Sequence, residues 1–231
     1  MGLSVQDLQF RFQVSVGLVS HIFTTWIKLL SRELKCLILW PSRADIRESM
    51  PESFKRWYPK TRCIIDCTEI FIETPSSLDN QAMCWSEYKY HCTIKCLIGI
   101  SPTGLISYVS KGYGGRASDK YIVEDSGFLQ LIEPYDQIMA DRGFKIRDLL
   151  VNVQASLTIP PSTRTALQMS KQDVKATSRI ANVRIYVEQA INRIKWYRIL
   201  SGELEMKLVT LTDDIILTCC ALCKLLYPLA M

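Results

Sequence analysis

An acidic residue interrupts one of the most apolar stretches of the chain. Asp66 lies in residues 62–73, RCIIDCTEIFIE, a run long and apolar enough for a strand buried on both faces. An unpaired buried carboxylate is strongly disfavoured or takes up a proton, so we expect a cation beside it. We interpret this cation as a divalent metal ion. Its other candidate ligands are Asp141, in QIMADRGF, and Glu188, in RIYVEQAINRIKWYRIL.

These three carboxylates would suit a two-metal site that cleaves phosphodiesters. Mg²⁺ is a hard cation that prefers carboxylate oxygens, and a pair of such ions activates the nucleophile and stabilises the leaving oxygen. Asp141 follows a short apolar strand predicted at 136–140, and strand ends of open α/β sheets are where ligands usually bind. The simpler interpretation of Glu188 is a salt bridge to Arg184, one turn earlier on the same helix.

The strands that must position Asp66 and Asp141 follow from the hydrophobic pattern. Residues 91–101 and 105–111 read as two strands joined by the turn Ser101-Pro102-Thr103-Gly104, which with the Asp66 strand predicts three consecutive antiparallel strands. A further short strand is predicted at 157–161, and helices are predicted at 121–131 and 146–151. Residues 74–81 read as a polar loop.

Glu188 belongs to a long helix predicted at about 176–200. Apolar residues recur there at helical spacing and form a stripe that must pack on the sheet, with Glu188 at its border. The stripe consists of Ile180, Val183, Val187, Ile191 and Ile194.

The N-terminal region has the outline of a helix-turn-helix. Helix starts are predicted at Ser4, which is followed by Asp7 in a capping-box spacing, and at Ser15. The second helix would enter a DNA major groove, with His21, Thr24 and Lys28 as candidate contacts. An ordinary helical hairpin fits the same pattern equally well. The predicted apolar stripe of the second helix consists of Val16, Val19, Phe23, Trp26 and Leu30.

Composition sets broad limits on function. The 231 residues carry a net charge of +5, with a pI near 8.7, which favours a polyanionic partner without requiring one. Nine cysteines lie mainly within apolar segments, so we interpret most of them as buried, reduced thiols and not as zinc ligands. The apolar C-terminal stretch at 215–231 is short for a bilayer span and contains Lys224, so we expect no membrane segment.

A glycine-rich basic loop follows the third predicted strand. Its sequence, KGYGGRASDK at 111–120, does not have the glycine spacing of a phosphate-binding loop. We interpret it as a flexible loop whose Arg116 and Lys120 could contact DNA phosphates. Lys195, near the end of the long helix, is a further candidate contact.

Several motifs recur in an order that resembles a known family. IIDCTEI, WSEYKYHCTIKCLIGISPTG, VSKGYGGRASDK, MADRGF, LTIPP and RIYVEQAINRIK together resemble the DDE endonuclease domain of PIF/Harbinger-type transposases, over about residues 62–225. The resemblance implies an RNase H-like α/β fold with a mixed sheet and flanking helices. It also implies a catalytic triad at Asp66, Asp141 and Glu188 that binds Mg²⁺ or Mn²⁺, whereas Asp119 and Glu69 match neighbouring motif positions.

The resemblance predicts three regions and a function. These are a partial helix-turn-helix at 1–45, a basic connector at 46–61 and the endonuclease domain at 62–231. The predicted function is metal-dependent cleavage of DNA, with a Myb-like DNA-binding protein as the implied partner and the nucleus as the expected location, alone or together with the cytoplasm. Two alternatives stay open at this stage: a domesticated, catalytically inactive DNA-binding or chromatin-associated protein, and a chain too truncated to act alone.

Overall fold

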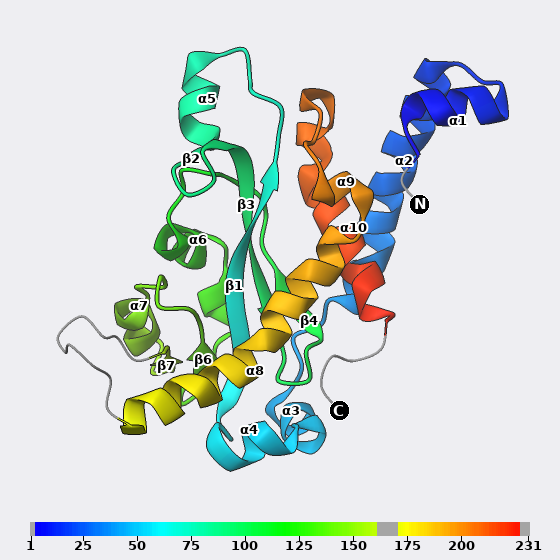
Figure 1. Cartoon of the computed structure of the whole chain (residues 1–231). Helices are drawn as coiled ribbons and strands as arrows, with labels where there is room; N and C mark the ends of the chain where they lie inside the picture. Colours follow the sequence, from blue (N-terminus) through cyan, green and yellow to red (C-terminus); the bar gives the residue numbers. More distant parts are fainter. Residues whose placement is uncertain (1–2, 161–170, 227–231) are drawn as a thin grey trace.

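The chain folds into a mixed β-sheet flanked by helices (Figure 1). The computed structural model describes residues 3–160 and 171–226, and it leaves out the side chains of 171–179 and 181–183. The strands are β1 Thr61–Phe71, β2 Trp85–Ser86, β3 His91–Ile100, β4 Ile106–Val109, β5 Tyr113–Gly114, β6 Gln137–Met139 and β7 Ser156–Thr158. The main helices are α1 Val5–Phe12, α2 Val16–Leu34, α3 Arg43–Ser49, α4 Glu52–Trp57, α5 Leu78–Cys84, α6 Asp119–Asp125, α7 Arg147–Asn152, α8 Lys171–Lys195, α9 Arg198–Ser201 and α10 Thr212–Lys224.

The long strand β1 lies in the middle of the sheet, whose order is β2-β3-β1-β6-β7. It pairs antiparallel with β3 and parallel with β6, and β4 and β5 add antiparallel to β3. The predicted antiparallel set is therefore confirmed as β1, β3 and β4. Its turn closes where Ser101 N–H donates to the Leu105 carbonyl at 2.9 Å, and Gly104 takes a left-handed φ of 82°.

Two hydrophobic cores cover the two faces of the sheet. Helices α8 and α10 cover one face, and α6 and α7 cover the other (Figure 1). The predicted stripe of α8 is confirmed for its described members, because Ile180, Val187, Ile191 and Ile194 are buried, while Val183 lies outside the described side chains. Each face of β1 therefore faces a core, as its apolar sequence predicted.

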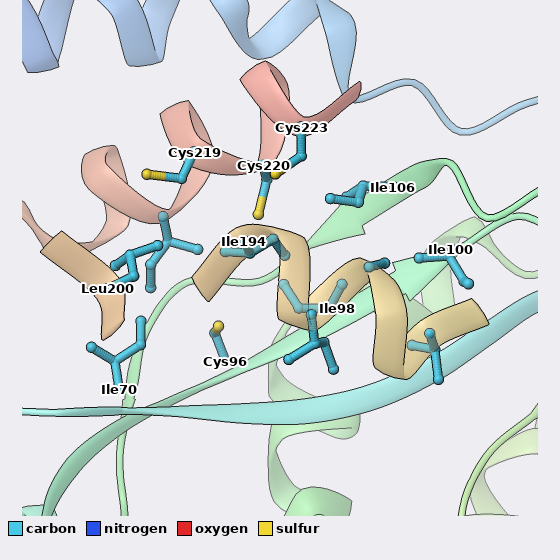
Figure 2. Close-up of a cluster of buried hydrophobic side chains, with 14 of the residues drawn as sticks. Ile70, Cys96, Ile98, Ile100, Ile106, Ile194, Leu200, Cys219, Cys220 and Cys223 are labelled. Atoms are coloured by element: carbon cyan, nitrogen blue, oxygen red, sulfur yellow. The ribbon is translucent and has the colours of Figure 1, made fainter. Parts of the chain in front are cut away.

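Cysteines contribute to the α8–α10 core as small apolar side chains. Cys96 of β3 lies near Ile194, and Cys219, Cys220 and Cys223 line α10 (Figure 2). Burial raises the pKa of the Cys96 thiol to about 12, which keeps it protonated at neutral pH. All nine cysteines are free, and the expectation that most of them are buried thiols is confirmed for Cys63, Cys92, Cys96, Cys219, Cys220 and Cys223.

Two N-terminal helices meet at a sharp angle, and the second of them packs against α10. Helices α1 and α2 are joined by a turn at Gln13, whose φ is 51°, and α2 lies along α10 (Figure 1). A neighbouring helix covers only a narrow stripe, so Val19 and Ile27 are buried while Val16 and Trp26 stay exposed. The apolar stripe predicted for this helix is therefore only partly covered by its neighbour. Whether this pair of helices is a DNA-binding module stays a prediction.

Two predicted boundaries shift for local reasons. The predicted polar loop at 74–81 ends earlier, because α5 begins at Leu78. The helix predicted at 121–131 is α6 followed by a 3-10 turn, Phe128–Leu131, since Gly127 adopts a left-handed φ of 80° and stops α6.

In the part of the chain that the structure describes, no single helix is long and apolar enough to cross a membrane, and only the sharply bent pair Val5–Phe12 and Val16–Leu37 passes that test jointly.

The glycine-rich loop at 111–120 is held tightly against β3 and α5. A Cβ atom on Gly115 would lie 2.2 Å from Thr93 Oγ1 and 2.6 Å from the Cys84 carbonyl oxygen. We therefore expect Gly115→Ala to lower the free energy of unfolding by about 1–3 kcal/mol, since backbone atoms must shift to admit the methyl group.

Urea denaturation monitored by circular dichroism measures this change. Gly202→Ala is the matched control, because its Cβ atom would meet nothing closer than 4.0 Å. Equal stability of the two variants would show that the loop does not need this close approach.

Candidate active site

Strand β1 places Asp66 on the face of the sheet that α8 covers. Side chains alternate along a strand, and Ile64 belongs to the α8–α10 core while Cys63 and Ile65 belong to the opposite core. Asp66 therefore shares the face of Ile64. Its Oδ1 accepts a hydrogen bond from the Cys67 N–H at 2.9 Å.

The parallel pairing of β6 with β1 brings Asp141 to the same place. Ile64 pairs with Met139 across the two strands. Two residues further along, Asp66 in β1 therefore lies beside Asp141, which follows the end of β6. The Asp141 side chain is 53% exposed, and its Oδ1 accepts hydrogen bonds from the Arg142 N–H at 2.7 Å and from Arg184 Nη1 at 3.1 Å.

Glu188 reaches the same cleft from α8. It is exposed, next to the buried residues Val187 and Ile191. One open cleft of about 830 Å³ is lined by Asp66, Asp141 and Glu188 together. Three carboxylates from three separate elements therefore face one space, and their assignment as catalytic residues stays a prediction.

Arg184 forms an ion pair with Asp141, and its positive charge also acts on Asp66. Burial raises the pKa of Asp66 to about 6, the positive charge of Arg184 opposes this shift, and the charges of Asp141 and Asp119 add to it. The Arg184 side chain is only 11% exposed, and among the residues that the structure describes its buried Nε has no hydrogen-bond partner. The carboxylate that pairs with Arg184 is Asp141. The simpler interpretation, a salt bridge between Arg184 and Glu188, is therefore not the ion pair observed here.

The cleft has the donor chemistry for Mg²⁺ or Mn²⁺ but is not arranged as a closed metal site. Its anionic lining groups are hard carboxylate oxygens, and burial keeps the neighbouring Cys67 a neutral thiol by raising its pKa well above the ordinary value. Within residues 3–160 and 171–226, no three His, Cys, Asp or Glu side chains lie close enough to hold one ion. Arg184 supplies the positive charge beside Asp66 and Asp141 instead.

A second charged cluster in the cleft was not predicted from the sequence. Lys95 Nζ lies 3.3 Å from Asp119 Oδ1 and 3.8 Å from Glu69 Oε1, and Thr93 Oγ1 donates to Glu69 Oε2 at 2.8 Å. The signal that could have revealed it is Lys95 itself, a charge within the apolar strand sequence HCTIKCLIGI. These partners satisfy Glu69 and Asp119, in keeping with their interpretation as neighbours of the triad.

The candidate DNA contacts are spread over several surfaces. Lys195 lines the cleft, and burial, followed by the positive charge of Lys89, lowers the pKa of Lys195. Arg116 is exposed, and Lys120 forms an ion pair with Asp148. The remaining three candidates, His21, Thr24 and Lys28, belong to α2, which lies along α10 away from the sheet (Figure 1).

Fold and cleft together define an RNase H-like nuclease architecture, with the mixed sheet and flanking helices that the resemblance predicted. The family model described as DDE superfamily endonuclease matches residues 65–224, a segment that contains Asp66, Asp141 and Glu188. The chain therefore belongs to the DDE superfamily endonuclease family. Neither a curated protein nor a solved structure matches the chain.

Proposed function

We propose that this protein is a PIF/Harbinger-type transposase-like enzyme that cuts DNA phosphodiester bonds in a metal-dependent reaction. Asp66, Asp141 and Glu188 are the proposed catalytic residues and metal ligands. The observation that carries the proposal is the position of Asp66, a largely buried carboxylate with a raised pKa that shares one cleft with the other two carboxylates.

Each group of the cleft has a distinct task in this proposal. Bound Mg²⁺ or Mn²⁺ would supply Lewis-acid activation of the attacking water and of the leaving oxygen. The Cys67 N–H fixes one oxygen of Asp66, and the Arg142 N–H fixes one oxygen of Asp141. Lys195, on the rim, provides a positive charge for the DNA backbone next to the acidic centre.

A plasmid-nicking assay tests this function. Purified protein should convert supercoiled plasmid to the open circle with Mg²⁺ or Mn²⁺ present, and a chelator should stop the reaction. Asp66→Ala prepared in parallel controls for contaminating nucleases. Nicking that is equal in the two preparations, or that persists in chelator, would remove the support for a metal-dependent nuclease.

One observation favours the alternative of a catalytically inactive DNA-binding protein. Arg184 lies against Asp141 and balances the charge of Asp66, so the cluster is already compensated. In an active enzyme the Arg184 side chain must move away when metal ions bind. In an inactive protein it would take the place of the metal ions permanently. The two functions therefore differ in how strongly wild-type protein binds metal.

Replacing Arg184 by methionine is expected to tighten Mn²⁺ binding about tenfold. A unit positive charge within about 5 Å of a divalent ion raises its free energy by about 1.5–2 kcal/mol even at the dielectric constant of water. Isothermal titration calorimetry without DNA measures the affinity directly.

Arg47→Met is the control for this measurement, because Arg47 is exposed on α3 and lines a different pocket. If the affinity for Mn²⁺ is unchanged or weaker in Arg184→Met, Arg184 does not compete with metal ions for this cluster. Wild-type protein that binds no Mn²⁺, beside a variant that does, would favour the inactive protein.

We extend the proposal to targeting and location. Helix α2 is the proposed groove-binding element, through His21, Thr24 and Lys28, and a Myb-like protein is the proposed partner. Localisation to the nucleus, with or without a cytoplasmic pool, follows from action on DNA. The division into regions 1–45, 46–61 and 62–231 belongs to the same proposal, although Ile27, Ile46 and Met50 share a core with the sheet.

A further inference from the structure

A turn with an exposed tyrosine forms part of the rim of the catalytic cleft. Residues 87–90 connect β2 to β3, and Tyr88 and Lys89 line the same cleft as the three carboxylates. The Tyr88 side chain is 78% exposed. A large aromatic ring that is exposed beside a candidate active site is available to a ligand.

This turn is held firmly in place. The Lys89 N–H donates to Ser86 Oγ at 3.2 Å, and the Tyr90 N–H donates to the Ser86 carbonyl at 2.8 Å. Ser86 is buried, and Tyr90 adopts a left-handed φ of 53°, which is uncommon for a tyrosine. The glycine-rich loop packs against the strand that follows the turn, through the close approach of Gly115 to Thr93. Tyr88 is therefore presented by a fixed backbone.

Positive charge gathers around the ring. Lys89 Nζ lies 4.5 Å from the centre of the Tyr88 ring and occupies one of its faces. Lys89 is also near enough to Lys195 to lower the pKa of that half-buried lysine, after the larger effect of burial. Two lysines that repel one another across the rim of a cleft would both be stabilised by an anionic group between them.

We propose that Tyr88, Lys89 and Lys195 form a nucleotide subsite, in which an unpaired base stacks on Tyr88 and its phosphate is bound by the two lysines. An aromatic ring that stacks with bases, together with cationic side chains that bind phosphates, is a combination by which proteins bind single-stranded DNA. Within a duplex the faces of each base are covered by its neighbours, so this ring selects DNA with an unpaired nucleotide next to the bond that is cut. The inference rests on the proposed nuclease function, because it places this nucleotide beside the catalytic carboxylates.

The test measures binding in chelator, without any cleavage. The probes are a duplex with a short single-stranded 3′ overhang that contains 2-aminopurine, and a blunt duplex of the same length. Alanine substitution of a stacking aromatic residue typically removes about 1–3 kcal/mol per base, which is about 5- to 150-fold in affinity. We expect Tyr88→Ala to lose at least fivefold in affinity for the overhang DNA and less than twofold for the blunt duplex.

Two further variants make the result specific. Tyr88→Phe keeps the ring and should retain both the affinity and the quenching of 2-aminopurine fluorescence on binding. Tyr135→Ala removes an equally exposed tyrosine, at 77%, which lies outside this cleft in a separate pocket, and it should behave as wild type.

The outcomes separate this subsite from the nuclease itself. Equal losses on both probes, no loss on either, or no binding of either probe by wild-type protein would each overturn the subsite. Because the measurement needs no metal and no cleavage, failure of metal-dependent nicking with intact overhang binding would contradict the nuclease function alone.

Discussion

Replacing Asp66 by asparagine is expected to lower the rate of metal-dependent DNA nicking by about 1,000-fold or more. Asparagine keeps the shape of the side chain and the oxygen that accepts the Cys67 N–H, but it removes the negative charge that would bind the metal ions. Metal-assisted stabilisation of the transition state contributes several kcal/mol, and each 1.4 kcal/mol is about a factor of ten in rate. Single-turnover nicking under saturating Mn²⁺ measures the loss.

A graded set of variants distinguishes the proposed ligands from their neighbours. Asp141→Asn and Glu188→Gln should show losses of the same order as Asp66→Asn. Asp119→Asn is the matched control, because Asp119 lines the same cleft but is bound to Lys95, and its rate should stay within about tenfold of wild type. If Asp119→Asn were as damaged as Asp66→Asn, the assignment of the triad would have to be revised.

Without metal, wild-type protein is expected to become less stable relative to Asp66→Asn as the pH rises from about 4 to about 7. Burial raises the folded-state pKa of Asp66 from 3.8 to about 6, so the fold favours the protonated form. A raised pKa contributes stability that is fully present below the unfolded value and is lost as the pH rises through the folded value. The shift corresponds to about 3 kcal/mol at most, since each pKa unit is worth about 1.4 kcal/mol.

Urea denaturation in chelator at several pH values measures this difference. Asparagine cannot ionise at this position, so subtracting the Asp66→Asn curve removes the contributions of the other titrating groups that the two proteins share. Saturating Mn²⁺ should reverse the trend for wild type, because metal binds the ionised carboxylate and adds stability by mass action. A difference between the two proteins that does not vary with pH would show that Asp66 is not a destabilised carboxylate.

Local sequence was informative where one physical requirement dominated. The position of Asp66 within the apolar run RCIIDCTEIFIE was enough to predict a carboxylate destabilised by burial, with a cation beside it, because burying an ion costs free energy in any fold. Strands β1, β3 and β4 followed from apolar runs and one turn, and the buried stripe of α8 followed from helical spacing. The ordered motifs indicated the endonuclease family, which the match over residues 65–224 confirms.

Local sequence patterns could not predict which residues far apart in the chain contact one another. Trp26 belongs to the apolar stripe predicted for α2, yet whether it is covered depends on the angle at which α2 meets α10. Likewise, the spacing of Arg184 and Glu188 on one helix favoured a local ion pair. The parallel register of β1 and β6 instead brings Asp141 to Arg184 at 3.1 Å.

The sequence by itself determined that Asp66 needs a cation, which elements carry the three carboxylates and which family the chain resembles, because burial, periodicity and motif order are properties of short segments. Only the tertiary structure decided that these carboxylates line one cleft, that Arg184 is the cation beside Asp66 and Asp141, and that Tyr88 stands on the rim with Lys89 and Lys195. Those relations depend on strand register and on how α8 crosses the sheet, which join residues that are far apart in the chain and carry no local signal.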